Sequence, residues 1–243
     1  MKENKYDNEQ FYQKYSQMER SKKGLAGAGE WSELQKILPD FQGKSILDLG
    51  CGYGWHCKYA AEHGAESVLG IDLSHKMLAT AKEKNSASQI DYLCLAMEDL
   101  NFPDNTFDVI LSSLAFHYVK DFEPLVANIA RWLKNDGSFV FSVEHPVFTS
   151  YGSQDWYYDA DGNILHFPVD NYYYEGKREA VFLGEPVIKY HRTLTTYLST
   201  LLQNGFSLQQ IIEPKPPKEM LNMEGMKDEM RRPMMLLISA IRR

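Results

Sequence analysis

Short apolar runs alternate with amphipathic stretches along the chain between residues 45 and 144. The apolar runs are rich in Ile, Val, Leu and Phe, as buried β-strands are. The stretches between them repeat apolar residues at helical spacing. The pattern predicts strands at 45–49, 67–71, 91–95, 107–112 and 138–143, and helices at 53–63, 75–83 and 122–134. Such alternation favours a mostly parallel sheet with helices on both faces.

Small residues mark several of the predicted helix ends. Gly64 and Gly137 follow the first and third helices, where glycine is the usual stop, and Ser74 is placed to cap the second. Farther along, a helix at 193–203 is followed by strands near 206–212 and 234–241. With these two strands the expected sheet contains seven.

An aromatic-rich segment interrupts the alternation from Pro146 to about Tyr190. Its aromatic residues are densest at 156–158 and 172–174, and residues 161–163 have the composition of a hairpin turn. We interpret the segment as an insertion that folds over the carboxyl edge of the sheet. A small satellite core is the alternative interpretation.

The N-terminal segment, residues 4–38, is predicted to be partly helical. It contains aromatic residues at partly helical spacing, then a flexible glycine-rich stretch at 24–29, then a short helix from Trp31 to Leu38. One interpretation is that these aromatic residues only pack on the edge of the sheet.

Composition and charge narrow the function classes. The formal net charge of −7 argues against broad binding of nucleic acid or anionic membranes, since both need a basic surface. The first residues lack the apolar core of a signal peptide, and the apolar stretch near the C-terminus is too short to span a bilayer. Three cysteines without a C-x-x-C pair fit a reduced compartment. We expect a cytoplasmic monomer or homodimer with no nucleic-acid or membrane partner.

The strongest chemical signal is the sequence SILDLGCGYG at residues 45–54, a strand that breaks into a glycine turn before a helix. Glycine lets the backbone approach a ligand closely, and the helix points free N–H groups at the turn. The dinucleotide fingerprint G-x-G-x-x-G/A needs a small third residue, but Trp55 stands there. Asp48, just before the turn, would repel a pyrophosphate and attract an ammonium group. The turn therefore favours a nucleoside with a cationic amino-acid tail, and the missing Gly-Lys-Ser/Thr excludes a P-loop.

This turn resembles the first motif of class I S-adenosylmethionine-dependent methyltransferases, of the type 11-like, small-molecule kind. The resemblance continues in the family's order through 68–74, 96–100, 107–110 and 133–138, and covers roughly residues 44–145. It implies a Rossmann-like, doubly wound α/β fold with a seven-stranded, mostly parallel sheet and one antiparallel strand near the C-terminus. It also implies methyl transfer from S-adenosylmethionine to a small-molecule acceptor, with S-adenosylhomocysteine as the product.

On this resemblance we expect one methyltransferase domain with four parts. They are an N-terminal helical lid (1–40), a cofactor-binding core (44–145), a substrate-side insertion (146–192) and a C-terminal helix with strands (193–243).

Cofactor contacts are expected in the loops at the carboxyl ends of the strands. Asp72 ends the second strand and is the expected partner of the ribose, because a carboxylate accepts from both hydroxyls. Leu73 and Met77 would flank the adenine, and Asp99 would accept from its amino group. Asp48 would face the cofactor's ammonium group or brace the glycine turn. The expected cofactor-binding residues are Asp48, Gly50, Cys51, Gly52, Gly54, Asp72, Leu73, Met77, Glu98, Asp99, Leu100 and Ser112.

Three residues are candidates for catalysis: His117, His145 and Glu144. His117 follows the fourth strand and titrates near neutrality, so it is a candidate general base, with a packing role as the alternative. Glu144 and His145 follow the fifth strand, where either would orient or deprotonate an acceptor. Arg192 would clamp an acidic group of the substrate or form a surface ion pair. The candidate substrate-binding residues are Tyr15, Trp31, Tyr118 and Arg192.

No metal is expected. Cys57 and His63 are six positions apart on a predicted helix, which does not place them on one face, and no second ligand cluster completes a zinc site. In-line methyl transfer needs mainly orientation, because the sulfonium methyl is already electrophilic, and a base only where the acceptor's proton must be removed. Two alternatives remain: a nicotinamide-dependent oxidoreductase, against which Trp55 weighs, and a non-catalytic S-adenosylmethionine-binding protein.

Overall fold

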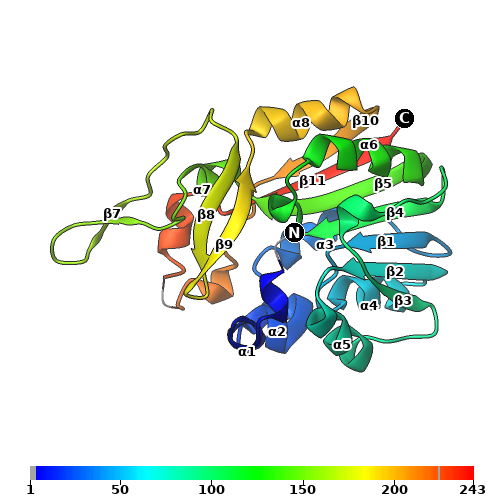
Figure 1. The fold of residues 1–243 in the computed structure, drawn as a ribbon, viewed down its shortest axis with the longest axis horizontal. Coiled ribbons are helices and arrows are strands. Elements are labelled where there is room, and N and C mark those ends of the chain that lie inside the picture. The colour runs from blue at the N-terminus through cyan, green and yellow to red at the C-terminus, as the bar shows by residue number, and fades with distance from the viewer. Residues whose placement is uncertain (1–3, 224) are drawn as a thin grey trace.

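A seven-stranded sheet forms the centre of the computed structural model, which describes residues 4–223 and 225–243 (Figure 1). Its strands lie in the order β10-β11-β5-β4-β1-β2-β3. β11 pairs antiparallel with both of its neighbours, and the other six strands are parallel. The strands are β1 (Ser45–Leu49), β2 (Ser67–Asp72), β3 (Ile90–Cys94), β4 (Phe107–Ser113), β5 (Leu133–Glu144), β10 (Phe206–Ile212) and β11 (Met235–Arg242). The predicted doubly wound α/β fold, with one antiparallel strand near the C-terminus, is confirmed.

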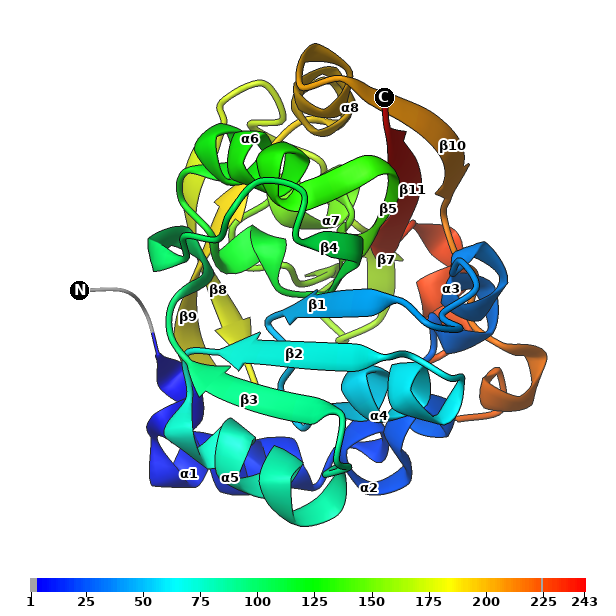
Figure 2. The same cartoon turned by 90° about the vertical axis from the view of Figure 1, so that its right-hand side faces the viewer.

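Helices cover both faces of the sheet (Figure 2). One layer consists of α3 (Trp31–Ile37), α4 (Trp55–Glu62) and α5 (His75–Lys84), and the other of α6 (Phe122–Trp132) and α8 (Leu194–Gln203). Successive residues of β1 alternate between the two cores, so that Ile46 packs under the first layer and Leu47 under the second. Because both faces of β1 are covered, the strand is apolar from Ile46 to Leu49 except at Asp48.

One helix ends earlier than its glycine predicted. α6 ends at Trp132, and β5 begins at Leu133 rather than at residue 138. Leu133 is fully buried and pairs with Phe107, so the chain enters the sheet as soon as the helix stops. The irregularity falls instead inside β5, where Asp136 has a φ of +59°. Gly137 therefore belongs to a bend in the strand and does not end the helix.

The N-terminal segment packs against the start of α5. Its elements are the 3-10 helices η1 (Lys5–Asp7) and η2 (Gly24–Gly27) and the helices α1 (Glu9–Ser16) and α2 (Glu19–Lys23). The Asp7 carboxylate accepts from Ser74 Oγ at 2.6 Å and from the backbone N–H of Lys76 at 3.1 Å. A negative charge at the N-terminus of α5 is favourable, because it meets the positive end of the helix dipole. These contacts fix the segment beside the loop that follows β2.

The aromatic-rich segment divides into two parts. Its elements are α7 (Pro146–Ser150), β6 (Tyr157–Tyr158), β7 (Ile164–His166), β8 (Gly176–Phe182) and β9 (Glu185–His191). The β8–β9 hairpin lies by the carboxyl ends of the central strands, whereas the loop that carries β7 extends outward (Figure 1). A small core of Phe11, Ala180 and Val187 joins the hairpin to α1. The segment therefore both covers the sheet edge and forms a satellite core. Tyr173 and Tyr174, in its densest aromatic run, are mostly exposed.

Short 3-10 helices occupy the remaining loops. They are η3 (Met97–Asp99), η4 (Phe116–Tyr118), η5 (Lys218–Met220) and η6 (Asp228–Arg231). No helix among the described residues is both long enough and apolar enough to cross a membrane.

Candidate active site

A cavity of about 850 Å³ opens at the carboxyl ends of the central strands. The loops after β1, β2, β3, β4 and β5 contribute to it, together with the N-terminal segment, the β8–β9 hairpin and the loop between β10 and β11. Between β1 and β4 the strand order reverses, and doubly wound sheets bind ligands at such a point. The volume lies within the roughly 300–1,000 Å³ typical of small-molecule sites.

The glycine turn presents bare backbone to this cavity. Gly50, Gly52 and Gly54 all have left-handed φ angles, of 76°, 54° and 75°. A Cβ on Gly50 would lie 2.4 Å from Ala115 Cβ, and one on Gly54 would lie 2.2 Å from the Tyr92 hydroxyl oxygen. A Cβ on Gly52 would meet no atom within 4 Å. At Gly50 and Gly54 a side chain is therefore excluded by close packing and also disfavoured by the left-handed φ. Gly54 does not line the cavity, whereas Gly52 faces open space in which a ligand can touch the backbone.

Asp72 stands at the end of β2 beside this turn. Its Oδ2 accepts from the Gly52 N–H at 2.9 Å, and its Oδ1 accepts from the Ser74 N–H at 2.8 Å. Burial raises the pKa of the carboxyl to about 6, although these backbone donors act to lower it. Leu73 and Met77 line the cavity next to Asp72. Each carboxylate oxygen keeps a further lone pair, so the group can still accept from ligand hydroxyls.

The loop after β3 brings only part of the predicted set of residues to the cavity. Ala96, Met97 and Glu98 line the cavity, but Asp99 does not, and Leu100 is buried in the core. The chain turns through η3 at this point, so successive side chains leave it in different directions. Neither Leu100 nor Asp99, both predicted to contact the cofactor, lines the cavity.

Asp48 lies beneath the glycine turn and not in the cavity. Its side chain is 1% exposed, and its Oδ2 accepts from Cys57 Sγ at 3.3 Å. Burial raises the pKa of this carboxyl to about 7, and the nearby Asp72 carboxylate acts in the same direction. Asp48 does not line the cavity, and the Gly52 N–H donates to Asp72 rather than to Asp48. Cys51 is also buried and does not line the cavity.

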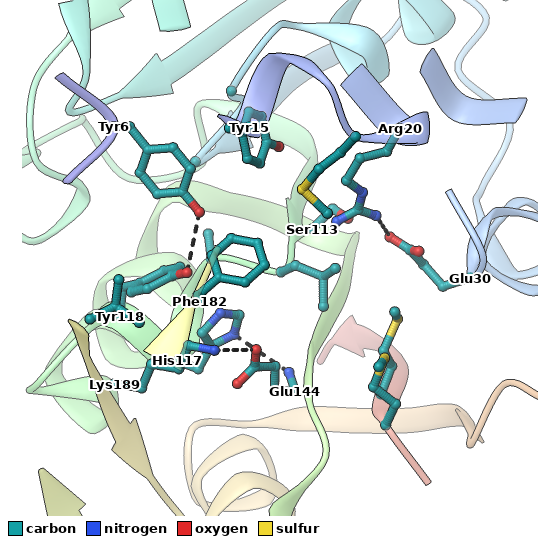
Figure 3. A pocket seen from close by; sticks show the side chains of 18 of the residues that line it. Tyr6, Tyr15, Arg20, Glu30, Ser113, His117, Tyr118, Glu144, Phe182 and Lys189 are labelled. Atoms are coloured by element: carbon teal, nitrogen blue, oxygen red, sulfur yellow. Dashed lines mark hydrogen bonds and ion pairs between the residues drawn. The ribbon is translucent and has the colours of Figure 1, made fainter. Parts of the chain in front are cut away.

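An ion pair from the N-terminal segment faces the cavity and was not predicted. Arg20 Nη2 donates to Glu30 Oε1 (Figure 3). Burial acts to lower the pKa of Arg20, but the Glu30 carboxylate outweighs it, and the net shift is upward. Glu30 is 1% exposed, and its Oε2 has no hydrogen-bond partner among the described residues. An unsatisfied buried carboxylate oxygen is costly, so this oxygen indicates where a ligand would donate.

A second ion pair lies in the wall made by β5 and β9 (Figure 3). Lys189 Nζ donates to Glu144 Oε1 at 2.6 Å and to Gln154 Oε1 at 2.7 Å. Gln154 Nε2 donates to Glu144 Oε2 at 2.7 Å, which closes the cluster. Burial acts to raise the pKa of Glu144, but His117 and Lys189 outweigh it, so the carboxyl is ionised at neutral pH.

His117 lines the cavity beside this cluster. Its Nδ1 accepts from the Glu144 backbone N–H at 3.5 Å. Burial lowers the pKa of the imidazole to about 4, so the ring is neutral at pH 7 and carries its proton on Nε2. A group with so low a pKa is a weak base, and this argues against the predicted general base. Tyr118 and Tyr15 also line the cavity, and Tyr118 Oη lies 3.2 Å from Tyr6 Oη.

Three other candidates lie outside the cavity. His145 caps α7, with Nδ1 accepting from the Val147 N–H at 3.0 Å and Nε2 2.8 Å from Glu213 Oε1. Ser112 is buried, and its hydroxyl donates to a backbone carbonyl of β1. Trp31 packs against aromatic rings of α4. The structure therefore does not bring His145, Ser112 or Trp31, predicted for catalysis, cofactor and substrate, to the cavity.

Arg192 does not line the cavity, and it forms no ion pair with any described residue. It is buried, and its guanidinium lies over the Phe122 ring at 5.1 Å. It donates to the backbone carbonyls of Phe116, Val119, Lys120 and Tyr190. Because three of these carbonyls belong to the loop after β4, Arg192 supports the wall that carries His117 and Tyr118 from behind.

Sequence patterns alone did not indicate most of the charged residues of the cavity. One sequence signal could have indicated that Lys189 faces inward: it shares the alternate positions of β9 with Val187 and His191, which are buried on the same face. Arg20 and Glu30 had none, because their pairing joins two short N-terminal segments with no recognisable motif. No group of three or more metal-ligating side chains is found among residues 4–223 and 225–243.

These features define a class of protein. A doubly wound sheet, a glycine turn open to the cavity and an acidic residue at the end of β2 are typical of Rossmann-like proteins that bind a nucleotide or nucleoside cofactor. The unpartnered Glu30 oxygen and the adjacent Arg20 add a pair of opposite charges. Such a pair fits the zwitterionic tail of S-adenosylmethionine, so the residues present fit this cofactor.

Comparison with known proteins identifies the family. The model of the methyltransferase domain family matches residues 47–141. The structure of an S-adenosylmethionine-dependent methyltransferase from Mesorhizobium loti is 41% identical, covers 90% of this chain and 100% of its own, and superposes with a TM-score of 0.82. A Listeria monocytogenes structure assigned to the same family is 56% identical over 90% of this chain and 99% of its own, with a TM-score of 0.86. The chain belongs to the S-adenosylmethionine-dependent methyltransferases.

A more distant relative has a named reaction. Ubiquinone biosynthesis O-methyltransferase from Neisseria meningitidis is 33% identical over 138 residues, which make up 51% of this chain and 58% of that protein.

Proposed function

We propose that the protein transfers the methyl group of S-adenosylmethionine to a small-molecule acceptor by in-line displacement. One observation carries this proposal: a single cavity joins Gly52 and Asp72 on one side to the Glu144–Lys189 cluster on the other. A cofactor seated against the glycine turn would thus share one space with its acceptor. The relative from Neisseria meningitidis, an O-methyltransferase, supports this reaction class.

On the cofactor side, Asp72 would accept from the two ribose hydroxyls, and Leu73 and Met77 would flank the adenine. Arg20 would pair with the carboxylate of the amino-acid tail, and Glu30 Oε2 would accept from its ammonium group. The orphan carboxylate oxygen supports this placement, because a donor from the ligand would remove its desolvation penalty. Bound there, the cofactor supplies an electrophilic methyl group.

On the acceptor side, the chain's task is orientation and exclusion of water. Holding an acceptor in line can supply about 7–11 kcal/mol of the barrier reduction in favourable cases. His117 would donate from Nε2 to the acceptor, and Tyr118 would contact it. The N-terminal part would act as the lid of the four-part domain, with the β8–β9 hairpin closing the other side.

Calorimetry with S-adenosylhomocysteine tests this function. We expect micromolar binding by the wild type and a loss of at least about 100-fold in Asp72→Ala, because two charge-assisted hydrogen bonds of about 1.5–3 kcal/mol each disappear. Asp161→Ala, in the exposed β6–β7 loop, should bind as the wild type does. If the folded wild type does not bind, the proposal fails.

Two further measurements separate the alternative functions. A fluorescence titration with NADH should show no binding, since binding there would favour an oxidoreductase. Transfer of a labelled methyl group across a panel of phenols, amines and thiols should show turnover. Cofactor binding without turnover on any of them would favour a non-catalytic binding protein.

A further inference from the structure

The buried Lys189–Glu144 ion pair adds little net stability to the cavity wall. The Lys189 side chain is 3% exposed and that of Glu144 15%. Burying two charges costs about as much as their attraction returns, so apolar residues of similar volume would stabilise the wall at least as well. Charges kept in a cleft therefore indicate a ligand that needs them.

The cluster presents donors to the cavity rather than acceptors. Two of the three N–H groups of Lys189 are used by Glu144 and Gln154, and the third has no hydrogen-bond partner among the described residues. Each Glu144 oxygen already accepts from a side chain within the cluster. His117 adds a neutral Nε2–H with no partner in the described part of the chain. Two unsatisfied donors, one of them cationic, thus stand in the same wall.

Apolar and aromatic side chains surround these donors. Phe148, Phe182, Met234 and Met235 line the cavity, and Lys189 Nζ lies 5.4 Å from the centroid of the Phe182 ring. Aromatic and methionine side chains suit a planar or irregular apolar body. An ammonium group would be repelled by Lys189, whereas an oxygen with negative charge would be stabilised by it.

We infer that Lys189 and His117 bind the acceptor through an acidic hydroxyl, phenolic or enolic, that is held as its oxyanion. This inference rests on the proposed function, since the methyl donor must lie beside the acceptor. The hydroxyl proton leaves to solvent on binding. A lone pair of the oxyanion forms the new bond to the methyl carbon. At the same time the sulfur–carbon bond breaks, and the electron pair of that bond stays on sulfur. The product is a methyl ether.

4-Nitrophenol is a suitable probe, because its absorbance reports whether the bound hydroxyl is ionised. We would titrate it from acid to alkaline pH in the presence of protein saturated with S-adenosylhomocysteine. A cation within hydrogen-bond reach should lower the pKa of the bound phenol by at least about one unit, which is a tenfold preference for the anion. 4-Nitroaniline, of the same shape but not acidic, should bind at least about tenfold more weakly than the phenolate.

The double variant Lys189→Met, Glu144→Gln removes both charges and leaves neither one buried alone. It should abolish the pKa shift of the bound phenol while S-adenosylhomocysteine binds as before. The matched control is the double variant Lys177→Met, Glu179→Gln on β8 of the same hairpin. It removes an exposed ion pair, in which Lys177 Nζ lies 2.8 Å from Glu179 Oε1, and should leave the pKa shift of the phenol unchanged. If the first double variant does not fold, Glu144→Gln alone keeps the ammonium group and should retain the shift.

The outcomes separate this inference from the function on which it rests. If the folded wild type does not bind S-adenosylhomocysteine, the proposed function is refuted. With that binding intact, three results would each overturn the inference: no binding of 4-nitrophenol, no shift of its pKa in the wild type, or a shift that survives the loss of Lys189.

Discussion

Replacing Asp48 by Asn tests the carboxyl buried beneath the glycine turn. Burial raises its pKa to about 7, since its charged form is poorly solvated there. When the pKa of an acid is higher in the folded state, its contribution to stability is complete below the unfolded pKa and is lost as the pH rises through the folded pKa. Asn is similar in shape, carries no charge and keeps an oxygen that can accept from Cys57 Sγ.

The magnitude follows from the two pKa values. For a carboxyl of pKa about 7 when folded and about 4 when unfolded, the free energy of unfolding falls by about 2.5 kcal/mol between about pH 5 and pH 8. Asp72, whose folded pKa is about 6, contributes a fall of the same sign of about 1.4 kcal/mol over that range. The buried imidazoles of His56 and His117, whose folded pKa values are about 4, act in the opposite direction over this range. The Asp48 contribution is therefore measured as the difference between the wild type and Asp48→Asn.

Urea unfolding at both pH values, followed by circular dichroism, measures these changes. We expect the change in the free energy of unfolding from about pH 5 to pH 8 to be more negative in the wild type than in Asp48→Asn, by about 2.5 kcal/mol. Asp161→Asn, on an exposed loop, should follow the wild type. Parallel pH profiles for the wild type and Asp48→Asn would refute the argument.

Three further predictions concern the turn, the cavity wall and the imidazole. Gly52→Ala should cost only about 1–2 kcal/mol of stability for its left-handed φ, yet weaken S-adenosylhomocysteine binding at least about tenfold, because its Cβ enters the cavity. Gly54→Ala should instead lower the free energy of unfolding by about 2–4 kcal/mol, because its Cβ would clash with Tyr92. If Gly52→Ala unfolds as readily as Gly54→Ala, this difference between the two glycines is refuted. Arg192→Met should lower the free energy of unfolding by about 3 kcal/mol, because buried backbone carbonyls would lose their hydrogen-bond donor. Urea unfolding that shows no change would exclude a supporting role for Arg192. His117→Ala should lower turnover about tenfold with calorimetric affinity for S-adenosylhomocysteine nearly unchanged, and unchanged turnover would remove it from the acceptor site.

The fold could be predicted because its signals are local. Strands β1, β2 and β4 and helix α5 lie within a residue or two of their predicted bounds, since hydrophobic periodicity, a serine cap and glycine turns act within a few residues. The α6–β5 boundary was misplaced for the opposite reason. Leu133 is drawn into the sheet by its pairing with Phe107, which is remote in sequence.

The site was only partly predictable. Gly52, Asp72 and Leu73 lie on the cavity because the family motifs place them at or just after a strand end, and Met77 follows in the first turn of α5. Asp48 belongs to the same motif, but its strand is covered on both faces, and the side chain that was expected to meet a ligand is buried under a helix.

The sequence alone determined the class of fold, the family and the edge of the sheet at which the cavity opens. Each of these depends on the order and spacing of residues along the chain, which a strand–turn–helix unit converts directly into geometry. Tertiary structure alone decided which charges meet in the cavity: Arg20 with Glu30, and Lys189 with Glu144. The physical reason is that an ion pair needs two side chains a few ångströms apart after the chain has folded. No local rule states which of the many charged residues the packing of a lid and a hairpin will bring so close.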